Sequence, residues 1–221
     1  MTGSDGTREL RVKGFLAQEK AERTTAIVAA AYELIDEGGL EDLTIRAVLK
    51  RTGLARRAFY ERFAGKDDLV LAVFEQAMGY AANMFADLVA PIPQPLDRLK
   101  AIIISIGRGS GAPDEPASGE GSRMAAALSR EHMRLAEARP AELQAALEPL
   151  FALIAQQIAE GIAAKQVRQA DPARLALFIY NLVATTVHTE LITGEGADDA
   201  AERRERLADE LLDFCRRAIA A

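Results

Sequence analysis

The sequence predicts an all-α fold of about nine helices, and three observations carry this prediction. Apolar residues recur at i, i+4, i+7 and i+8 along most of the 221 residues, which is the spacing of one face of a helix. No segment alternates apolar and polar residues with the two-residue period of a half-buried strand. Glycine and proline stand where the periodic segments stop, as they do at helix ends.

Three helices are expected in the first third of the chain, over residues 20–37, 45–51 and 55–63. The first stops at a pair of glycines, because glycine adopts the left-handed C-cap conformation without strain. Thr44 supplies a side-chain oxygen that can cap the second helix. Gly53 lies in the tight turn that leads into the third.

Six longer helices are expected in the rest of the chain. A proline-rich corner follows the first of them, and Pro172 suits the first position of another. Their expected ranges are 66–90, 96–107, 123–138, 141–164, 172–194 and 198–219. The segment 107–122 is rich in Gly, Pro and Ser, and the sequence leaves open whether it is a lid over a pocket or a disordered loop.

The composition is that of an ordinary globular protein. Apolar residues make up 49% of the chain and charged residues 27%. No apolar run reaches the roughly 18 residues that a membrane-spanning helix needs, and the N-terminus lacks the apolar core of a signal peptide. A single cysteine, Cys215, excludes a disulfide framework. We therefore expect a cytoplasmic protein with no membrane partner.

Residues that catalysis and metal binding usually need are scarce. The chain has two histidines, one cysteine and no tryptophan, and the spacings of serine triads, zinc motifs and phosphate loops are missing. His132 and His188, each close to a glutamate in sequence, are an alternative metal pair, but structural histidines are the commoner arrangement. We expect no enzymatic activity, no cofactor and no metal.

Basic residues gather in one short segment of an otherwise acidic chain. The formal net charge is −6, yet residues 43–66 hold seven Lys and Arg against one acid, Glu61. Such a local excess is typical of a small anion-binding surface, and the alternative is a solvated basic helix face.

The same segment has the pattern of a helix-turn-helix over residues 44–63. Phe59 and Phe63 lie at i and i+4 and are expected to point inward. The outer face is then left to Arg56, Arg57 and Tyr60. Arginine reads guanine through two hydrogen bonds in the major groove, and a tyrosine hydroxyl binds phosphate. The alternative is a helical hairpin that serves packing alone.

Several short motifs occur together in one register around this hairpin. They are Ile27-x-x-x-Ala31-x-x-Leu34-x-x-x-Gly38, Leu43-Thr44-Ile45, Thr52-Gly53-Leu54 and Phe59-Tyr60-x-x-Phe63-x-x-Lys66-x-x-Leu69. Through these motifs the stretch from Arg23 to Leu69 resembles the DNA-binding domain of the TetR family of bacterial transcriptional regulators. The remaining helices resemble the family in length and order only. The resemblance implies a flexible extension over 1–19, a DNA-binding domain over 20–66 and a ligand-binding and dimerisation domain over 67–221.

The resemblance also implies roles for individual residues in DNA binding. The implied contacts come from Thr44, Arg46, Ala55, Arg56, Arg57, Ala58, Tyr60 and Lys66. Of these, Thr44, Tyr60 and Lys66 would hold phosphates, whereas Arg56 and Arg57 would lie near base edges. Three positions depart from the commonest family pattern: Leu49 replaces a small alanine, Ala55 the usual capping serine and Ala58 a frequent threonine.

For the C-terminal body the resemblance implies a homodimer formed through 172–194 and 198–219, and a pocket for a small, largely apolar effector. The candidate pocket residues are Met84, Met124, His132, Phe151, Tyr180, Asn181, Thr185 and His188. Asn181, Thr185 and His188 share one line along a helix, and the alternative for that line is a dimer seam or a solvent stripe.

Taken together, the pattern favours a homodimeric repressor that binds a palindromic DNA operator and releases it when a small molecule binds. Repression, rather than activation, is implied by the resemblance alone. Two alternatives are a constitutive DNA-binding protein without an effector and an all-helical protein in which 44–63 only packs.

Overall fold

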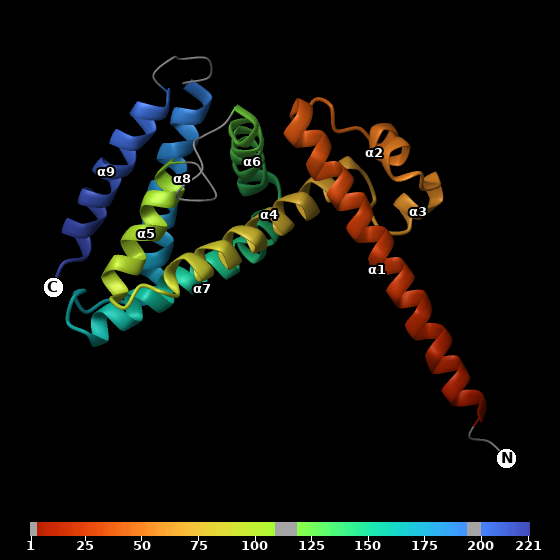
Figure 1. The fold of residues 1–221 in the computed structure, drawn as a ribbon, viewed down its shortest axis with the longest axis horizontal. Helices are drawn as coiled ribbons and strands as arrows, with labels where there is room; N and C mark the ends of the chain where they lie inside the picture. The colour runs from red at the N-terminus through yellow and green to blue at the C-terminus, as the bar shows by residue number, and fades with distance from the viewer. Residues whose placement is uncertain (1–3, 109–118, 194–199) are drawn as a thin grey trace. The chain divides into compact units, whose positions relative to one another are not determined.

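The computed structural model describes residues 4–108, 119–193 and 200–221, and the side chains of 18–108, 124, 126–190 and 202–221 (Figure 1). An isolated β-bridge joins Val167 to Ala220, and the elements of the described ranges are otherwise helices. They are α1 Ser4–Gly38, α2 Ile45–Thr52, α3 Arg56–Tyr60, α4 Lys66–Val89, α5 Pro95–Arg108, α6 Gly119–Ala138, α7 Pro140–Ala163, α8 Pro172–Thr193 and α9 Ala200–Ile219. The all-α prediction is confirmed. Most of the expected loop 107–122 lies outside the described residues.

The chain divides into two compact units, one that ends at Val73 and one that begins at Phe74. The first unit holds α1, α2, α3 and the start of α4, and the second holds the remainder. The boundary therefore falls inside the single helix α4.

In the first unit, α1 begins at Ser4 rather than at the expected residue 20, inside the segment expected to be a flexible extension. The upstream residues include no proline, so nothing removes a backbone donor from the growing helix. Ion pairs between successive turns, such as Glu19 with Arg23 at 2.5 Å, also favour helix here.

The core of the first unit comes from the residues that the motifs place inward. Ile27, Ala31 and Ile35 on α1 are buried, as are Val48 on α2 and Phe59 on α3. The third helix is shorter than expected, because α3 ends at Tyr60 and Glu61 forms its C-cap. Phe63 follows in the non-helical link to α4 but is still buried, so the link itself is held on the core.

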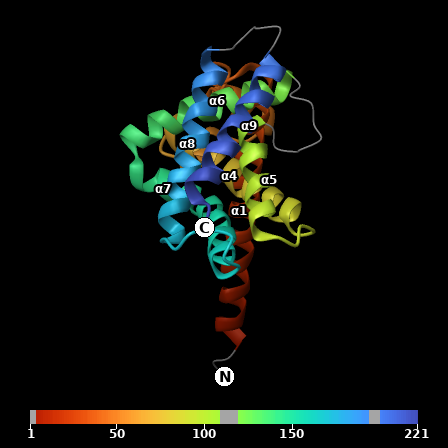
Figure 2. The same ribbon diagram turned by 90° about the vertical axis from the view of Figure 1, so that its left-hand side faces the viewer.

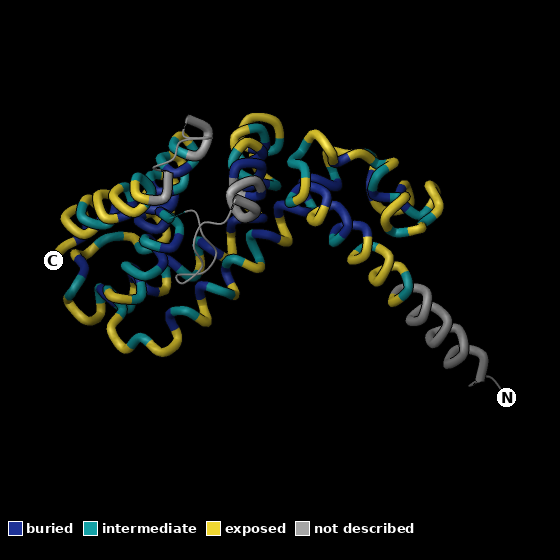
Figure 3. Tube along the Cα trace, turned by 45° about the horizontal axis from the view of Figure 1, so that its top comes forward, coloured by how far each residue is buried: buried dark blue, intermediate teal, exposed yellow. Residues whose placement is uncertain are grey.

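In the second unit, α5 packs against both α7 and α9, and α7 packs against α8 (Figure 2). Buried residues recur along these helices every three to four positions, and Figure 3 shows the resulting mixture of buried and exposed positions. Helices α5 and α9 approach closely at Gly107, where a Cβ would lie 2.9 Å from that of Ala208.

On α9, Leu211 and Cys215 are buried, whereas Phe214, which has the same helical spacing, is 61% exposed. The inward stripe instead runs through Ala208, Leu211, Cys215 and Ile219, because α9 turns this edge towards α5. Burial raises the pKa of the Cys215 thiol to about 11, as suits a core residue.

Of the described helices, α4 alone is long and apolar enough, by length and composition, to cross a membrane. In its most apolar 18-residue window, 44% is buried inside the protein. Leu69, Phe74 and Phe85 on this helix are buried, as in the core helix of a folded domain.

Candidate nucleic-acid interface and ligand cavity

The cap of α2 sets the start of the candidate DNA-binding hairpin. Thr44 has extended backbone angles, and its Oγ1 accepts a hydrogen bond from the Ala47 amide at 3.1 Å. This bond satisfies one of the free amides at the helix start. The hydroxyl proton of Thr44 is not used in this bond, so it can be donated to a phosphate.

The turn after α2 depends on a left-handed glycine. Gly53 has φ 68°, and its amide donates to the Leu49 carbonyl at 3.0 Å. The Thr52 hydroxyl donates to the Val48 carbonyl at 2.9 Å and accepts from the Leu54 amide at 3.3 Å. These bonds fix the direction in which the chain leaves α2 and enters α3.

Packing of aromatic rings holds the buried side of α3 in place. The ring of Phe59 is fully buried and lies 5.5 Å from that of Phe63 and 5.3 Å from that of Tyr60, centroid to centroid. Ala55, at the N-cap, makes no side-chain cap, as expected where a serine is replaced. Ala58 is half-buried and lines a groove beside α1, so its methyl group is directed partly towards α1.

The outer face of α3 is cationic and open. The Arg57 side chain is 90% exposed, and its Nε donates to Glu61 Oε1 at 3.0 Å. Arg56 donates to the Tyr60 hydroxyl at 3.3 Å, with its guanidinium carbon 5.4 Å from the ring centroid. Arg46 is exposed on α2. Three guanidinium groups are thus presented by one short hairpin.

Two other basic residues of the segment contact the protein itself. Arg51 binds Glu37 through two hydrogen bonds, at 2.9 and 2.7 Å, and so links α2 to α1. The hydrogen bond from Arg51 holds the pKa of the Glu37 carboxyl below its usual range. Lys66 is exposed and donates one hydrogen bond to the Leu40 carbonyl at 2.9 Å, which leaves two ammonium protons for another acceptor.

Sequence reasoning missed two cationic residues beside α3. Lys20 and Arg23 on α1 line the same groove as Ala58 and Arg62. The sequence signal for them was weak, because they lie outside the basic segment 43–66. They add basic side chains to the edge of the candidate interface.

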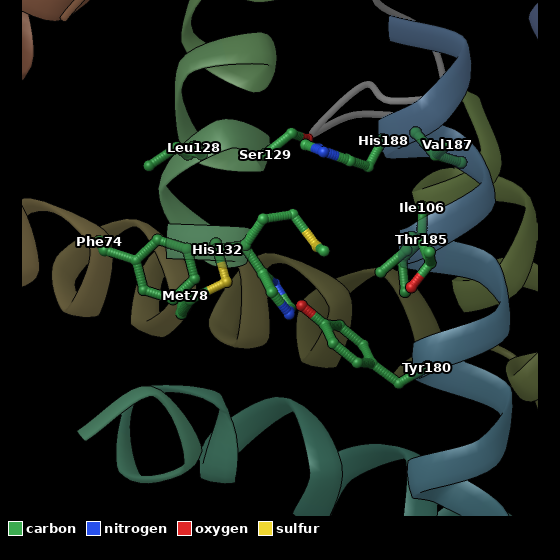
Figure 4. Close-up of a pocket in the computed structure, with 12 residues that line it drawn as sticks. Phe74, Met78, Ile106, Leu128, Ser129, His132, Tyr180, Thr185, Val187 and His188 are labelled. Atoms are coloured by element: carbon green, nitrogen blue, oxygen red, sulfur yellow. The ribbon is translucent and has the colours of Figure 1, made fainter. Parts of the chain in front are cut away.

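A cavity of about 190 Å³ lies within the second unit, between α4, α5, α6 and α8 (Figure 4). Four predicted pocket residues line it, namely His132, Tyr180, Thr185 and His188. Eight further residues line it, and most are apolar residues, which carry no sequence signal that separates a cavity wall from solid packing. They are Phe74, Met78, Ile106, Leu128, Ser129, Met133, Ala184 and Val187.

The other four predicted pocket residues are not among those that line the cavity. Phe151 lies behind its wall, with its ring edge-on to that of Tyr180 at 5.1 Å. Asn181 is exposed on α8, Met84 is half-buried on α4 and Met124 is buried in α6.

The titratable groups of the cavity favour their uncharged forms. Burial, and then the nearby His188, lower the pKa of His132. Burial, and then Arg130, lower the pKa of His188. Burial raises the pKa of the Tyr180 hydroxyl above its usual range. Over the described part of the chain, no three His, Cys, Asp or Glu side chains gather as metal ligands.

Large apolar side chains are also exposed on α8 and α9. Leu177 is 41% exposed, Phe178 53% and Phe214 61%. The guanidinium carbon of Arg174 lies 5.5 Å from the centroid of the Phe178 ring. Exposed apolar residues of this size on neighbouring helices are typical of a protein-protein contact.

Comparison with known proteins gives a family match for the N-terminal region and a fold for most of the chain. The family model for bacterial regulatory proteins of the tetR family matches residues 27–73. A TetR-family transcriptional regulator from Pectobacterium atrosepticum has a similar structure, with 20% identity, a TM-score of 0.72 and coverage of 92% of this chain and 97% of that one. No curated protein is significantly similar in sequence.

Two further solved structures have the same fold. NemR of E. coli in its reduced form is 15% identical, with a TM-score of 0.64 and coverage of 90% of this chain and 97% of that one. FadR from Bacillus subtilis in complex with stearoyl-CoA is 18% identical, with a TM-score of 0.64 and coverage of 86% and 96%. The tetR-family model thus matches the helix-turn-helix region of the chain, and the chain shares the fold of solved TetR-family transcriptional regulators.

Proposed function

We propose that the protein is a homodimeric, ligand-responsive repressor that acts in the cytoplasm. In this proposal it binds a palindromic operator through 44–66. It releases the operator when a small molecule enters the cavity between α4, α5, α6 and α8, called here the α4–α8 cavity. The observation that carries the DNA-binding part is the outer face of α3. There a 90% exposed arginine, Arg57, stands on a helix that buried aromatic rings hold in place.

Arg57 suits base reading because its guanidinium is both accessible and oriented. Its present partner is the exposed carboxylate of Glu61 at 3.0 Å, and an exposed pair of this kind is worth at most about 1 kcal/mol. Exchange of that partner for the O6 and N7 atoms of a guanine therefore costs little. Arg56 and Tyr60 already contact each other, so one of them can hold a phosphate while the other approaches a base.

A homodimer is required for specificity, since one small module buries too little DNA surface. Its two recognition helices must lie about 34–36 Å apart to enter successive major grooves. Leu177, Phe178 and Phe214 supply the exposed apolar surface for association through α8 and α9. We expect Phe178→Glu to yield monomers in light scattering, whereas Tyr80→Glu, at a 70% exposed aromatic of α4, leaves the dimer intact.

Release of DNA follows from linkage between the ligand and the spacing of the two DNA-binding units. Phe74 and Met78 line the cavity and belong to α4, whose first residues are part of the DNA-binding unit. A ligand that binds best at another spacing lowers operator affinity by the ratio of its affinities for the two states. The stearoyl-CoA in the FadR structure supports a small-molecule effector. We do not transfer that ligand, because no Lys or Arg among the described lining residues would meet its phosphates.

The test starts with selection of random duplexes on the purified protein, followed by salt titration of the best site. We expect a palindrome with half-sites about one helical turn apart, bound more weakly as salt rises. Arg57→Ala should then lose about 1–3 kcal/mol at one base position of each half-site. The control is Lys100→Ala on α5, which removes a basic side chain paired with an acid of the same helix and lies outside both proposed interfaces.

A folded protein that enriches no sequence at any salt concentration would overturn the DNA-binding proposal and favour the packing-only alternative. Operator binding that no cavity ligand weakens would instead favour a constitutive DNA-binding protein.

A further inference from the structure

The residues that line the α4–α8 cavity limit the chemical class of molecule that it can bind. The described residues that line it include no Asp, Glu, Lys or Arg. An ion moved into such a site loses its hydration without gaining a countercharge from the lining, which is strongly unfavourable. The cavity therefore selects uncharged molecules.

The size of the cavity limits the occupant to one small ring. Its volume is about 190 Å³, below the roughly 300–1,000 Å³ of sites for drug-sized ligands. An engineered apolar cavity of about 150 Å³ in another protein holds one benzene molecule. The space here accommodates such a ring with one small substituent.

The walls favour an aromatic ring over a compact aliphatic molecule. The ring of His132 stacks on that of Tyr180 at 6.1 Å and 17°, and meets that of Phe74 edge-on at 6.1 Å (Figure 4). The thioethers of Met78 and Met133 complete the lining on either side. Ring edges, ring faces and thioether sulfurs are the groups against which aromatic rings pack best.

One polar group of the cavity lacks a partner within the described structure. His188 Nδ1 is buried and has no hydrogen bond there, although buried polar atoms are nearly always paired. Figure 4 shows its imidazole extending from α8 across the top of the cavity towards α6. A neutral imidazole nitrogen donates or accepts one hydrogen bond, and a ligand hydroxyl satisfies it in either tautomer.

We propose that the cavity binds an uncharged, single-ring aromatic molecule with one hydroxyl-bearing substituent, whose hydroxyl pairs with His188 Nδ1. This proposal rests on the proposed function only in calling that molecule the effector. Binding itself is measurable without DNA.

The experiment compares four probes of similar size on the full-length protein by calorimetry and ligand-detected NMR. Benzyl alcohol should bind, and toluene, which lacks the hydroxyl, should bind about 3- to 10-fold more weakly, as the loss of one hydrogen bond predicts. Benzoate and benzylamine, which are charged, should bind at least about 10-fold more weakly than benzyl alcohol.

Three variants locate the binding. His188→Leu should remove the difference between benzyl alcohol and toluene, and Ala184→Phe should abolish binding of both because it fills the cavity. Asn181→Leu is the control, since Asn181 is exposed on the same helix and does not line the cavity. Circular dichroism of each variant establishes that the helices are intact.

The outcomes separate the two proposals. Tightest binding of benzoate or benzylamine, an unchanged alcohol preference in folded His188→Leu, or no binding of any probe to the wild type overturns the ligand class. Benzyl alcohol that binds in the cavity but leaves operator affinity unchanged refutes release by this ligand and leaves the ligand class standing.

Discussion

Gly53 offers the sharpest test of how the DNA-binding hairpin is held, because its backbone conformation excludes most residues. With φ at 68° it lies in the left-handed region, where an L-residue with a Cβ is strained. A Cβ built at this position meets nothing within 4 Å. The cost of Gly53→Ala is therefore conformational alone, with no contribution from steric clash.

Because the cost is conformational alone, the size of the destabilisation can be stated. Alanine in the left-handed conformation costs about 1–2 kcal/mol, and Gly53→Ala should destabilise the first unit by about this amount. Gly53→Asn should destabilise the first unit clearly less, because asparagine tolerates this conformation. Gly79→Ala serves as the opposite control, since Gly79 lies inside α4 with open space around it, and alanine there should stabilise the helix by up to about 1 kcal/mol.

The assay is native-state hydrogen exchange of the α2 and α3 amides, because the two units need not unfold together. Gly53→Ala should lower protection of these amides about 5- to 30-fold, which corresponds to the expected free energy. Operator affinity should change little while the hairpin is still mostly folded. Full protection in Gly53→Ala, or an equal loss in Gly53→Asn, would refute the argument from backbone strain.

Three further predictions concern charge, pH and packing. Lys66→Ala should reduce the slope of log affinity against log salt concentration by about 1, because the ammonium group is proposed to neutralise one phosphate. The slope is measured by titration of the operator at several salt concentrations. An unchanged slope would mean that Lys66 contacts only the Leu40 carbonyl. Burial lowers the pKa of His132, so the unfolded chain binds more protons than the folded chain. The free energy of unfolding therefore falls as the pH drops through the ordinary imidazole range. His132→Gln should make the free energy of unfolding, measured by urea denaturation, depend less on pH between about pH 7 and pH 5. Gly107→Ala brings a Cβ to 2.9 Å from the Cβ of Ala208 and 3.0 Å from its Cα, so it should lower stability by about 1–3 kcal/mol in the same assay, and a stabilised variant would contradict this close approach.

Several features of the DNA-binding hairpin were decided locally and could be predicted. Thr44 as a cap and Gly53 as a left-handed turn follow from residue chemistry within a few positions. The burial of Phe59 and Phe63 was also predicted, although Phe63 lies in the link after α3 and not on the helix that the spacing assumed. The basic segment and the family motifs also lie in contiguous sequence. These features depend on nearest neighbours in the chain, so the sequence alone determined them.

Only the tertiary structure decided what each face of a helix packs against. Asn181, Thr185 and His188 form one line in the sequence, yet Thr185 and His188 line the cavity and Asn181 does not. Phe214 has the spacing of a core residue but lies outside the contact between α9 and α5. Periodicity defines a face of a helix but not its neighbour.

The cavity itself was beyond prediction for the same reason. Its walls bring Phe74, His132 and Tyr180 together from three helices that are far apart in the chain. A contact of this kind depends on how long helices cross, and the crossing is set by packing of the whole unit. The sequence by itself determined the helices and the DNA-binding hairpin, and only their packing decided where the chain leaves room for a ligand.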